Sequence, residues 1–455
     1  MNSINKLRFL NHASFALENN STILLIDPWY EGKAFFNSWA LLDDQTSNHE
    51  VMQYLIESEK KIFIWFSHEH SDHFSISFLK ILKMHALKVE ILFQGTLDNR
   101  VVDYLRGESF EVKECNDGAR VKLDSELHIS TWSYLGGDSF CLIESQGISI
   151  LNVNDCVIDT KKRAEFVRDL VMEKVDKVDI LFSQFGYANW IGNESDHLSR
   201  IAAAAERFCR IRLQAEALSP SIVVPFASYV YFCRQNNFYL NDFQNSPKNL
   251  REAKELRNWQ DKIFFMKPFD EIEMIDAGTS AAQLSQLTKS AENHWNHLKM
   301  SISPDATQEP TVDMAVITEV FRKYQNEIKR NFYFIPHVLE LFRILKPLKI
   351  YLDDLKTVVE ISYTRGIKIR TLEVIWDISM HSSMFEFVLK NKFGCNTMLV
   401  GGNFRMRDPK CESIVTRFFI PQELFKAGYG FKHPMTIFKL IVQMLGKVLG
   451  NHGPR

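Results

Sequence analysis

The feature that most constrains this chain is a short segment rich in metal-ligating groups, His68-Glu69-His70-Ser71-Asp72-His73. It follows the apolar run 62–66, which predicts a buried strand that ends in a ligand-rich loop and opens a helix at 74–82. His68 and His70 alternate by two, so they point the same way in locally extended backbone. Imidazole and carboxylate suit zinc, iron or manganese. A polar turn whose histidines cap a helix is the structural alternative, and the density of ligand groups favours a metal site.

Composition limits the class of protein. At 455 residues the chain exceeds the size at which a single core stops growing, so two domains are expected. The formal net charge of -2, without a long basic stripe, argues against a nucleic-acid partner. The seven cysteines form no C-x-x-C pair and predict reduced thiols in a cytoplasmic protein. The N-terminus lacks an apolar signal-peptide core, and no apolar run is long enough to span a bilayer.

Strand and helix patterns alternate over residues 1–275 and predict two mixed sheets covered by helices. A polar helical connector and a linker follow at 276–310. A C-terminal α+β domain is predicted at 311–430, helical over 312–340 and with an edge hairpin formed by 394–400 and 403–407. Residues 431–455 carry lysines and no acid, and they predict a basic amphipathic tail helix that packs on the second domain or touches a membrane peripherally.

The His-x-His-x-Asp-His segment resembles the signature of the metallo-β-lactamase superfamily. The resemblance implies an α/β fold of the αββα sandwich type and one or two divalent ions. In that superfamily the first two histidines bind one metal and the Asp-His pair binds the other. The implied metal ligands are His68, His70, Asp72, His73 and, as a bridging carboxylate after the strand 149–152, Asp155. Asp27 resembles the structural carboxylate that orients the His loop through hydrogen bonds.

Four segments, in order, are similar to the metal-binding domain of CMP-N-acetylneuraminate hydroxylases over roughly residues 5–275. They are Asp27-Pro28-Trp29 with Gly32-Lys33-Ala34-Phe35, the His loop, Gly147 to Cys156, and Val224-Pro225-Phe226-Ala227-Ser228-Tyr229.

Three departures from that family change the expected site. No cysteine has a histidine two or three places after it, as Rieske iron–sulfur ligands require. The third metal histidine is missing, which leaves His128 and His197 as candidate extra ligands, and Ala227 or a neighbour replaces the last one.

Three functions follow from these residues. The first is a hydrolase of a small polar, sugar- or phosphate-containing substrate that uses metal-bound hydroxide, with Asp72 accepting a proton if it is not a ligand. The second is an iron-dependent oxygenase that takes electrons from a separate Rieske-type or ferredoxin partner. The third is a binding protein that has lost catalysis. Tyr229 in the Pro-Phe turn and Arg234 after it are the candidate substrate contacts. The absence of an electron-delivering motif favours hydrolysis at this point.

Overall fold

The computed structural model describes residues 6–273 and 281–429. The chain divides into two compact units at Asp305/Ala306. The predicted tail helix at 431–455 therefore lies outside the described residues. Among the residues that are described, no helix is both long and apolar enough to cross a membrane.

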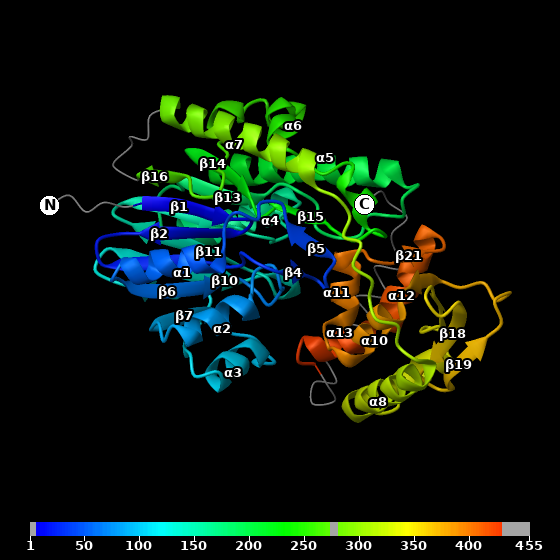
Figure 1. Cartoon of the computed structure of the whole chain (residues 1–455). Coiled ribbons are helices and arrows are strands. Elements are labelled where there is room, and N and C mark those ends of the chain that lie inside the picture. The colour runs from blue at the N-terminus through cyan, green and yellow to red at the C-terminus, as the bar shows by residue number, and fades with distance from the viewer. Residues whose placement is uncertain (1–5, 274–280, 430–455) are drawn as a thin grey trace. The chain divides into compact units, whose positions relative to one another are not determined.

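The first unit is built on two large sheets that lie face to face (Figure 1). The seven-stranded sheet has the order β16 (Glu271–Glu273), β1 (Lys6–Asn11), β2 (Ser14–Glu18), β3 (Thr22–Ile26), β6 (Lys61–Phe66), β7 (Val89–Gln94) and β8 (Glu111–Cys115). The six-stranded sheet has the order β14 (Ile222–Phe226), β13 (Ile180–Gln184), β12 (Ile148–Asn152), β11 (Ser139–Ser145), β10 (Leu127–Ser133) and β9 (Arg120–Lys122). A small third sheet joins β15 (Val230–Phe232), β5 (Trp39–Leu41) and β4 (Lys33–Ala34).

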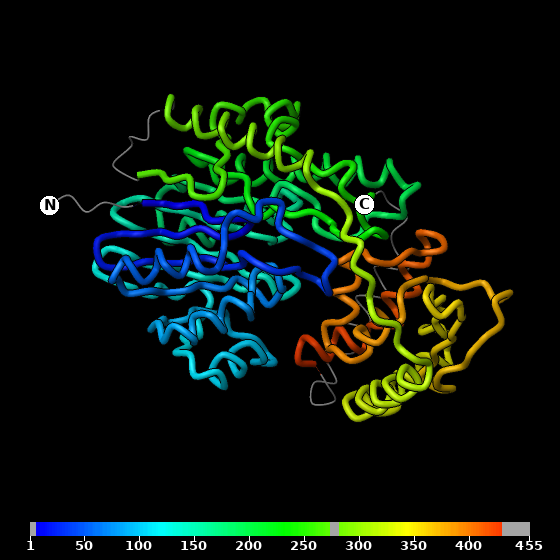
Figure 2. The backbone as a smooth tube through the Cα atoms, in the orientation of Figure 1, coloured from blue at the N-terminus to red at the C-terminus, as the bar shows by residue number. Residues whose placement is uncertain are grey.

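Helices cover the outer faces of both large sheets (Figure 1). One layer contains α1 (Asn48–Glu57), α2 (Ile76–Met84) and α3 (Arg100–Gly107). The other contains α4 (Lys161–Met172), α5 (His197–Leu218), α6 (Pro247–Glu252) and α7 (Ala281–Ser301). Figure 2 shows the chain returning late in this unit to place β16 beside β1, an antiparallel pair. This arrangement confirms the predicted α/β fold of the αββα sandwich type.

Strand β6 shows why the sequence pattern before the His loop is continuously apolar. Ile62 and Ile64 belong to the core under α1–α3, whereas Phe63 and Trp65 belong to the core between the two sheets. A parallel strand that is buried on both faces has no polar side to alternate. Across the sheet interface Phe15 stacks on Phe182 with ring centroids 4.3 Å apart. This aromatic pair joins β2 of one sheet to β13 of the other.

The second unit contains a five-stranded sheet with helices. Its strand order is β19 (Gly366–Arg370), β18 (Thr357–Ser362), β17 (Leu348–Leu352), β20 (Ile378–Met380) and β21 (Arg405–Met406). Its helices are α8 (Met314–Phe332), α9 (Ile335–Leu341), α10 (Ser382–Lys390), α11 (Gly394–Gly401), α12 (Glu412–Phe418) and α13 (Ile420–Lys426).

Two local predictions for the second unit were wrong. Residues 394–400 were expected as one strand of an edge hairpin, but they form helix α11. A β-carbon on Gly394 would lie 2.5 Å from the Val388 backbone, so the glycine allows α11 to begin directly against α10. The helix predicted over 312–340 is two helices, because the backbone of Tyr333 turns to a φ of 52° between α8 and α9.

Candidate metal centre

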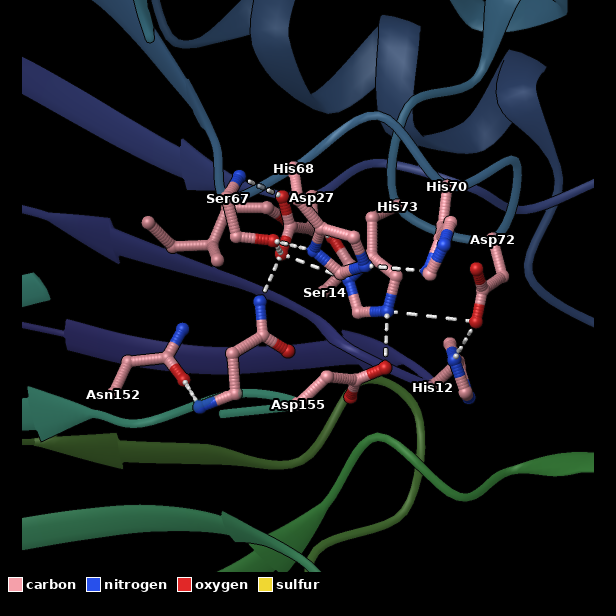
Figure 3. Close-up of polar contacts among 12 residues, drawn as sticks. His12, Ser14, Asp27, Ser67, His68, His70, Asp72, His73, Asn152 and Asp155 are labelled. Carbon is pink, nitrogen blue, oxygen red and sulfur yellow. Dashed lines mark hydrogen bonds and ion pairs between the residues drawn. The ribbon is translucent and has the colours of Figure 1, made fainter. Parts of the chain in front are cut away.

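The His loop leaves the end of β6 and gathers its side chains at one edge of the sandwich (Figure 3). The ends of strands β3 and β12 reach the same edge, which brings Asp27 and Asp155 to the loop. Two groups of three side chains lie there, and within each group the three ligand atoms are all within 4.8 Å of one another. One group is His68, His70 and Asp155, and the other is His12, Asp72 and His73.

The first group faces the accessible side of the centre. His68 Nε2 lies 2.9 Å from His70 Nδ1, and Gln184 holds Asp155 by donating to its Oδ1 at 2.8 Å. His68 is buried, whereas His70 and Asp155 are half-buried. Two imidazoles and one carboxylate with an accessible side are a ligand set for a divalent ion that keeps positions open for substrate or solvent.

The second group is completely buried and includes His12, a residue that sequence reasoning missed. Asp72 Oδ2 lies 3.2 Å from His12 Nε2 and 3.4 Å from His73 Nε2. His73 Nε2 is also 3.5 Å from Asp155 Oδ2, so Asp155 stands between the two groups. Buried polar atoms normally have a hydrogen-bond partner, yet Asp72 Oδ1 and His73 Nε2 have none among the described residues. A cation bound by this group would give partners to buried atoms that the protein leaves without a hydrogen bond.

His12 lies beside the segment around Ala227, where the sequence lacks an expected metal histidine. It lies in the tight turn between β1 and β2 with a φ of 39°, a left-handed conformation that costs energy for a residue with a β-carbon. The Ala227 amide, just after β14, donates to the His12 carbonyl at 2.7 Å. The residue after β14 therefore contacts the β1–β2 turn, and that turn supplies the His12 imidazole to the second ligand group. The sequence did offer one signal for His12: a histidine stands in a tight hairpin turn, where glycine or asparagine is usual.

Asp27 fixes the orientation of both groups from behind. Its carboxylate accepts from the Ser67 amide at 2.8 Å, the Ser67 hydroxyl at 2.7 Å and Asn154 Nδ2 at 2.7 Å. His73 Nδ1 is 3.0 Å from the same carboxylate, so it must donate, and Nε2 is left facing the centre as an acceptor. The Ser67 hydroxyl donates its hydrogen bond to Asp27, so its oxygen accepts from His68 Nδ1 at 2.9 Å. One carboxylate therefore selects the metal-ready tautomer of a histidine in each group.

The charges of Asp72 and His73 are strongly coupled. Burial alone would raise the pKa of Asp72, but His73 and His12 outweigh it and hold that pKa well below the ordinary 3.8. Burial would lower the pKa of His73, but Asp72 and Asp155 raise it well above the ordinary 6.5. A carboxylate with a lowered pKa is a weak proton acceptor near neutrality. Asp72 is therefore better suited to bind a metal than to act as the predicted general base.

These shifts predict that a metal ion competes with a proton on His73. The raised pKa of His73 stabilises the metal-free fold below about pH 6.5, and that contribution is lost as pH rises through the folded-state pKa. The lowered pKa of Asp72 stabilises the fold above about pH 3.8, and that contribution is lost as pH falls through its folded-state value. Metal affinity should therefore rise with pH above 6.5, with proton release. Calorimetric titration in two buffers of different ionisation enthalpy measures the protons released, and equal heats in both buffers would contradict the expectation.

The structure does not bring the other predicted site residues to this centre. His128 lies at the end of β10 remote from Ser133, opposite Glu144, and His197 is an exposed residue at the start of α5 with its Nδ1 3.2 Å from Arg200. Tyr229 is fully buried and donates to the Met266 carbonyl at 2.6 Å.

Arg234 is also buried, and its Nη1 donates to Asp305 at 3.0 Å. The predictions that Tyr229 and Arg234 contact substrate therefore receive no support, because both side chains are engaged within the fold.

A carboxylate that sequence reasoning missed does lie near the first group. Asp138 Oδ1 is 3.9 Å from His68 Nε2. It directly follows the segment 132–137, where the third metal histidine was sought and not found. The sequence signal for Asp138 was an acidic residue that follows two glycines and directly precedes β11.

Together the αββα sandwich and the paired ligand groups define a metallo-β-lactamase-type fold with a candidate metal centre. No protein-family model matches the chain. Among curated proteins, it is 26% identical over 265 residues to the cytidine monophosphate-N-acetylneuraminic acid hydroxylase of Danio rerio, covering 54% of this chain and 42% of that protein. It is 25% identical over 263 residues to the Mus musculus protein of the same name, covering 54% and 43%. The chain thus matches less than half the length of these relatives.

Solved structures with a similar chain course include proteins of the same fold. The metallo-β-lactamase fold protein YhfI from Bacillus subtilis is 9% identical with a TM-score of 0.38, covering 60% of this chain and 100% of that one. A mutant of the CmlA beta-hydroxylase is 16% identical with a TM-score of 0.40, covering 60% and 54%. Zinc-bound PqqB from Methylobacterium extorquens is 11% identical with a TM-score of 0.32, covering 58% and 87%. The predicted resemblance to CMP-N-acetylneuraminate hydroxylases is confirmed by the sequence similarity to the curated proteins of that name.

Proposed function

We propose that this chain is an iron-dependent oxygenase that hydroxylates a small anionic, sugar-derived substrate at a two-metal centre. The observation that carries the proposal is the pair of ligand groups, each made of two imidazoles and one carboxylate. Two histidines and one carboxylate with open positions are the ligand set of non-haem iron oxygenases. A further carboxylate, Asp138, lies with its Oδ1 3.9 Å from His68 Nε2 of the first group.

The two ligand groups fit two divalent metal ions, and each ion would have a different role. His12, Asp72 and His73 would hold the buried ion, and His68, His70 and Asp155 would hold the ion on the accessible side, where substrate arrives. Iron bound there would supply the activation of dioxygen, whereas zinc would instead lower the pKa of water. Through these hydrogen bonds Asp27 would leave Nε2 of His68 and of His73 available to the metals. The burial of the second group excludes bulk water from one side of the centre.

The reaction needs an electron donor that is separate from the described residues. Hydroxylation replaces one C–H bond of the substrate by C–OH, takes one oxygen atom from O₂, and reduces the other to water with two electrons and two protons. The sequence first favoured hydrolysis because it shows no Rieske ligand pairs. Delivery of electrons by a Rieske-type or ferredoxin partner removes that objection. The names of the curated relatives support hydroxylation and suggest CMP-N-acetylneuraminic acid as the first substrate to assay.

Hydrolysis is the second candidate function, and the buried state of Asp72 bears on it. The fully buried carboxylate and its lowered pKa leave it unsuited to accept a proton from an attacking water. Asp155, which is half-buried on the accessible side, is the remaining carboxylate of the two groups that a hydrolase could use.

The deciding experiment loads the full chain with Fe(II) without oxygen, or with Zn(II), and offers both forms the same substrate. The iron form with dithionite-reduced ferredoxin should consume O₂ and give a product heavier by one oxygen atom. Two metal equivalents should bind to the unmodified chain and about one to His12→Ala. His128→Ala, a histidine outside both groups, is the matched control and should retain both equivalents. Ester or lactone cleavage by the zinc form, with no O₂ uptake by the iron form, would replace the proposal by the hydrolase.

A further inference from the structure

The second unit presents an apolar helix face to solvent at α9. Phe334, Val338, Leu341 and Phe342 are 69%, 37%, 76% and 71% exposed. Their spacing of four, three and one residues places them on one side of the helix. We call this set the α9 face. Single exposed apolar residues are ordinary, but a contiguous set that includes two phenylalanines marks an interaction surface.

The packing of α9 fixes this orientation. On the opposite side of the helix Pro336 and Glu340 are buried. Glu340 Oε2 accepts from the Thr364 amide at 2.7 Å, which anchors α9 to the turn after β18. Breaking that bond would leave a buried carboxylate without its donor, so the helix cannot simply rotate its apolar residues inward. The α9 face is therefore held outward by the fold.

Four basic residues flank the α9 face along the chain. Lys329 and Arg330 end α8, and Arg343 and Lys346 follow α9; all four are exposed. Within the described part of the chain, no ion pair is found for any of them. The acidic residue between positions 329 and 346 is Glu340, which is buried and already engaged. An apolar face with a cationic border fits a surface that is itself apolar beneath a layer of negative charge.

We propose that the α9 face docks the protein peripherally on an anionic phospholipid surface. Its phenylalanines would enter the boundary between headgroups and acyl chains, and its four basic side chains would contact phosphate and carboxylate groups. Charge selects lipid over two other occupants. A second copy of this face would bring four like charges against four. Residues 430–455 contain Lys432, Lys439, Lys447 and Arg455 and no acid, so that segment would also meet the face with like charge.

Vesicle flotation with the full chain tests the proposal. The protein should float with vesicles of phosphatidylcholine mixed with phosphatidylserine, stay behind with phosphatidylcholine alone, and detach as salt is raised. Phe334→Ser with Phe342→Ser should weaken partitioning by about tenfold or more, because two large apolar side chains no longer enter the bilayer. Lys329→Gln with Arg330→Gln should weaken it by about fivefold per charge removed.

Matched controls show whether the α9 face itself makes the contact with lipid. Met84→Ser and Leu198→Ser change apolar residues of the first unit that are 82% and 81% exposed, and they should leave flotation unchanged. Equal flotation of the Phe334→Ser/Phe342→Ser protein and the unmodified chain would overturn the proposal. Loss of binding only on truncation after residue 429 would assign the contact to the tail instead. Concentration-dependent dimers in sedimentation velocity, abolished by the same pair of substitutions and without vesicle binding, would assign the α9 face to self-association.

Discussion

Asp155→Ala is expected to cost the enzyme both of its ions and all measurable turnover. Asp155 belongs to the first ligand group, and its Oδ2 also lies 3.5 Å from His73 Nε2 of the second. Its removal takes away the carboxylate, and its negative charge, that stands between the two ligand groups. The loss of metal affinity should exceed the roughly 10- to 100-fold that follows removal of a residue that only supports a ligand. Elemental analysis after gel filtration measures the bound metal, with O₂ uptake measured on the same samples.

Asp159→Ala is the control for this variant. Asp159 lies in the same loop after β12, where it forms an ion pair with Arg163 at 2.5 Å and belongs to neither ligand group. It should keep two metal equivalents and full turnover. An Asp155→Ala protein that keeps two equivalents would show that the two groups do not share this carboxylate, and the proposed centre would have to be redrawn.

Asp27→Asn is expected to destabilise the metal-free fold by about 3 kcal/mol, because a buried carboxylate that accepts four hydrogen bonds would be replaced by a group that donates on one side. Metal affinity should fall by a further 10- to 100-fold or so, since the tautomers of His68 and His73 are no longer enforced. Urea unfolding after chelation measures the first effect, and competition with a chelating dye measures the second.

Asp124→Asn is the matched control for Asp27→Asn. Asp124 also accepts several hydrogen bonds, from the Glu126 and Leu127 amides among others, but it is only half-buried and remote from the ligand groups. Its replacement should cost roughly 1 kcal/mol without changing metal binding. Equal metal affinity of Asp27→Asn and the unmodified chain would mean that Asp27 supports the fold alone.

The sandwich and the His loop could be predicted from the sequence because both depend on patterns among neighbouring residues. A continuously apolar strand followed by closely spaced histidines needs no tertiary information, and Asp27 and Asp155 each follow an apolar strand directly. His12 could not be found this way, because its role depends on β14 reaching the β1–β2 turn, more than two hundred residues along the chain.

Other predictions concern residues whose surroundings the local sequence pattern does not report. Tyr229 and Arg234 were chosen for their chemistry beside a recognised turn, but burial, which the local pattern does not report, decides whether such groups meet a ligand. The segment 394–400 was predicted to be a strand, but it forms helix α11. The close approach that Gly394 permits is a property of the packed helices, not of the segment.

The distribution of ligands over both sheets has a consequence for biogenesis. His68 and His70 follow β6 of one sheet, whereas Asp155 follows β12 of the other, so neither half of the sandwich alone completes the accessible group. Loading of that ion can only follow closure of the two halves, and the loaded ion then holds them closed by mass action. When the metal is scarce, newly made protein without the ion would unfold more easily, and proteases would degrade it before the metal-loaded protein.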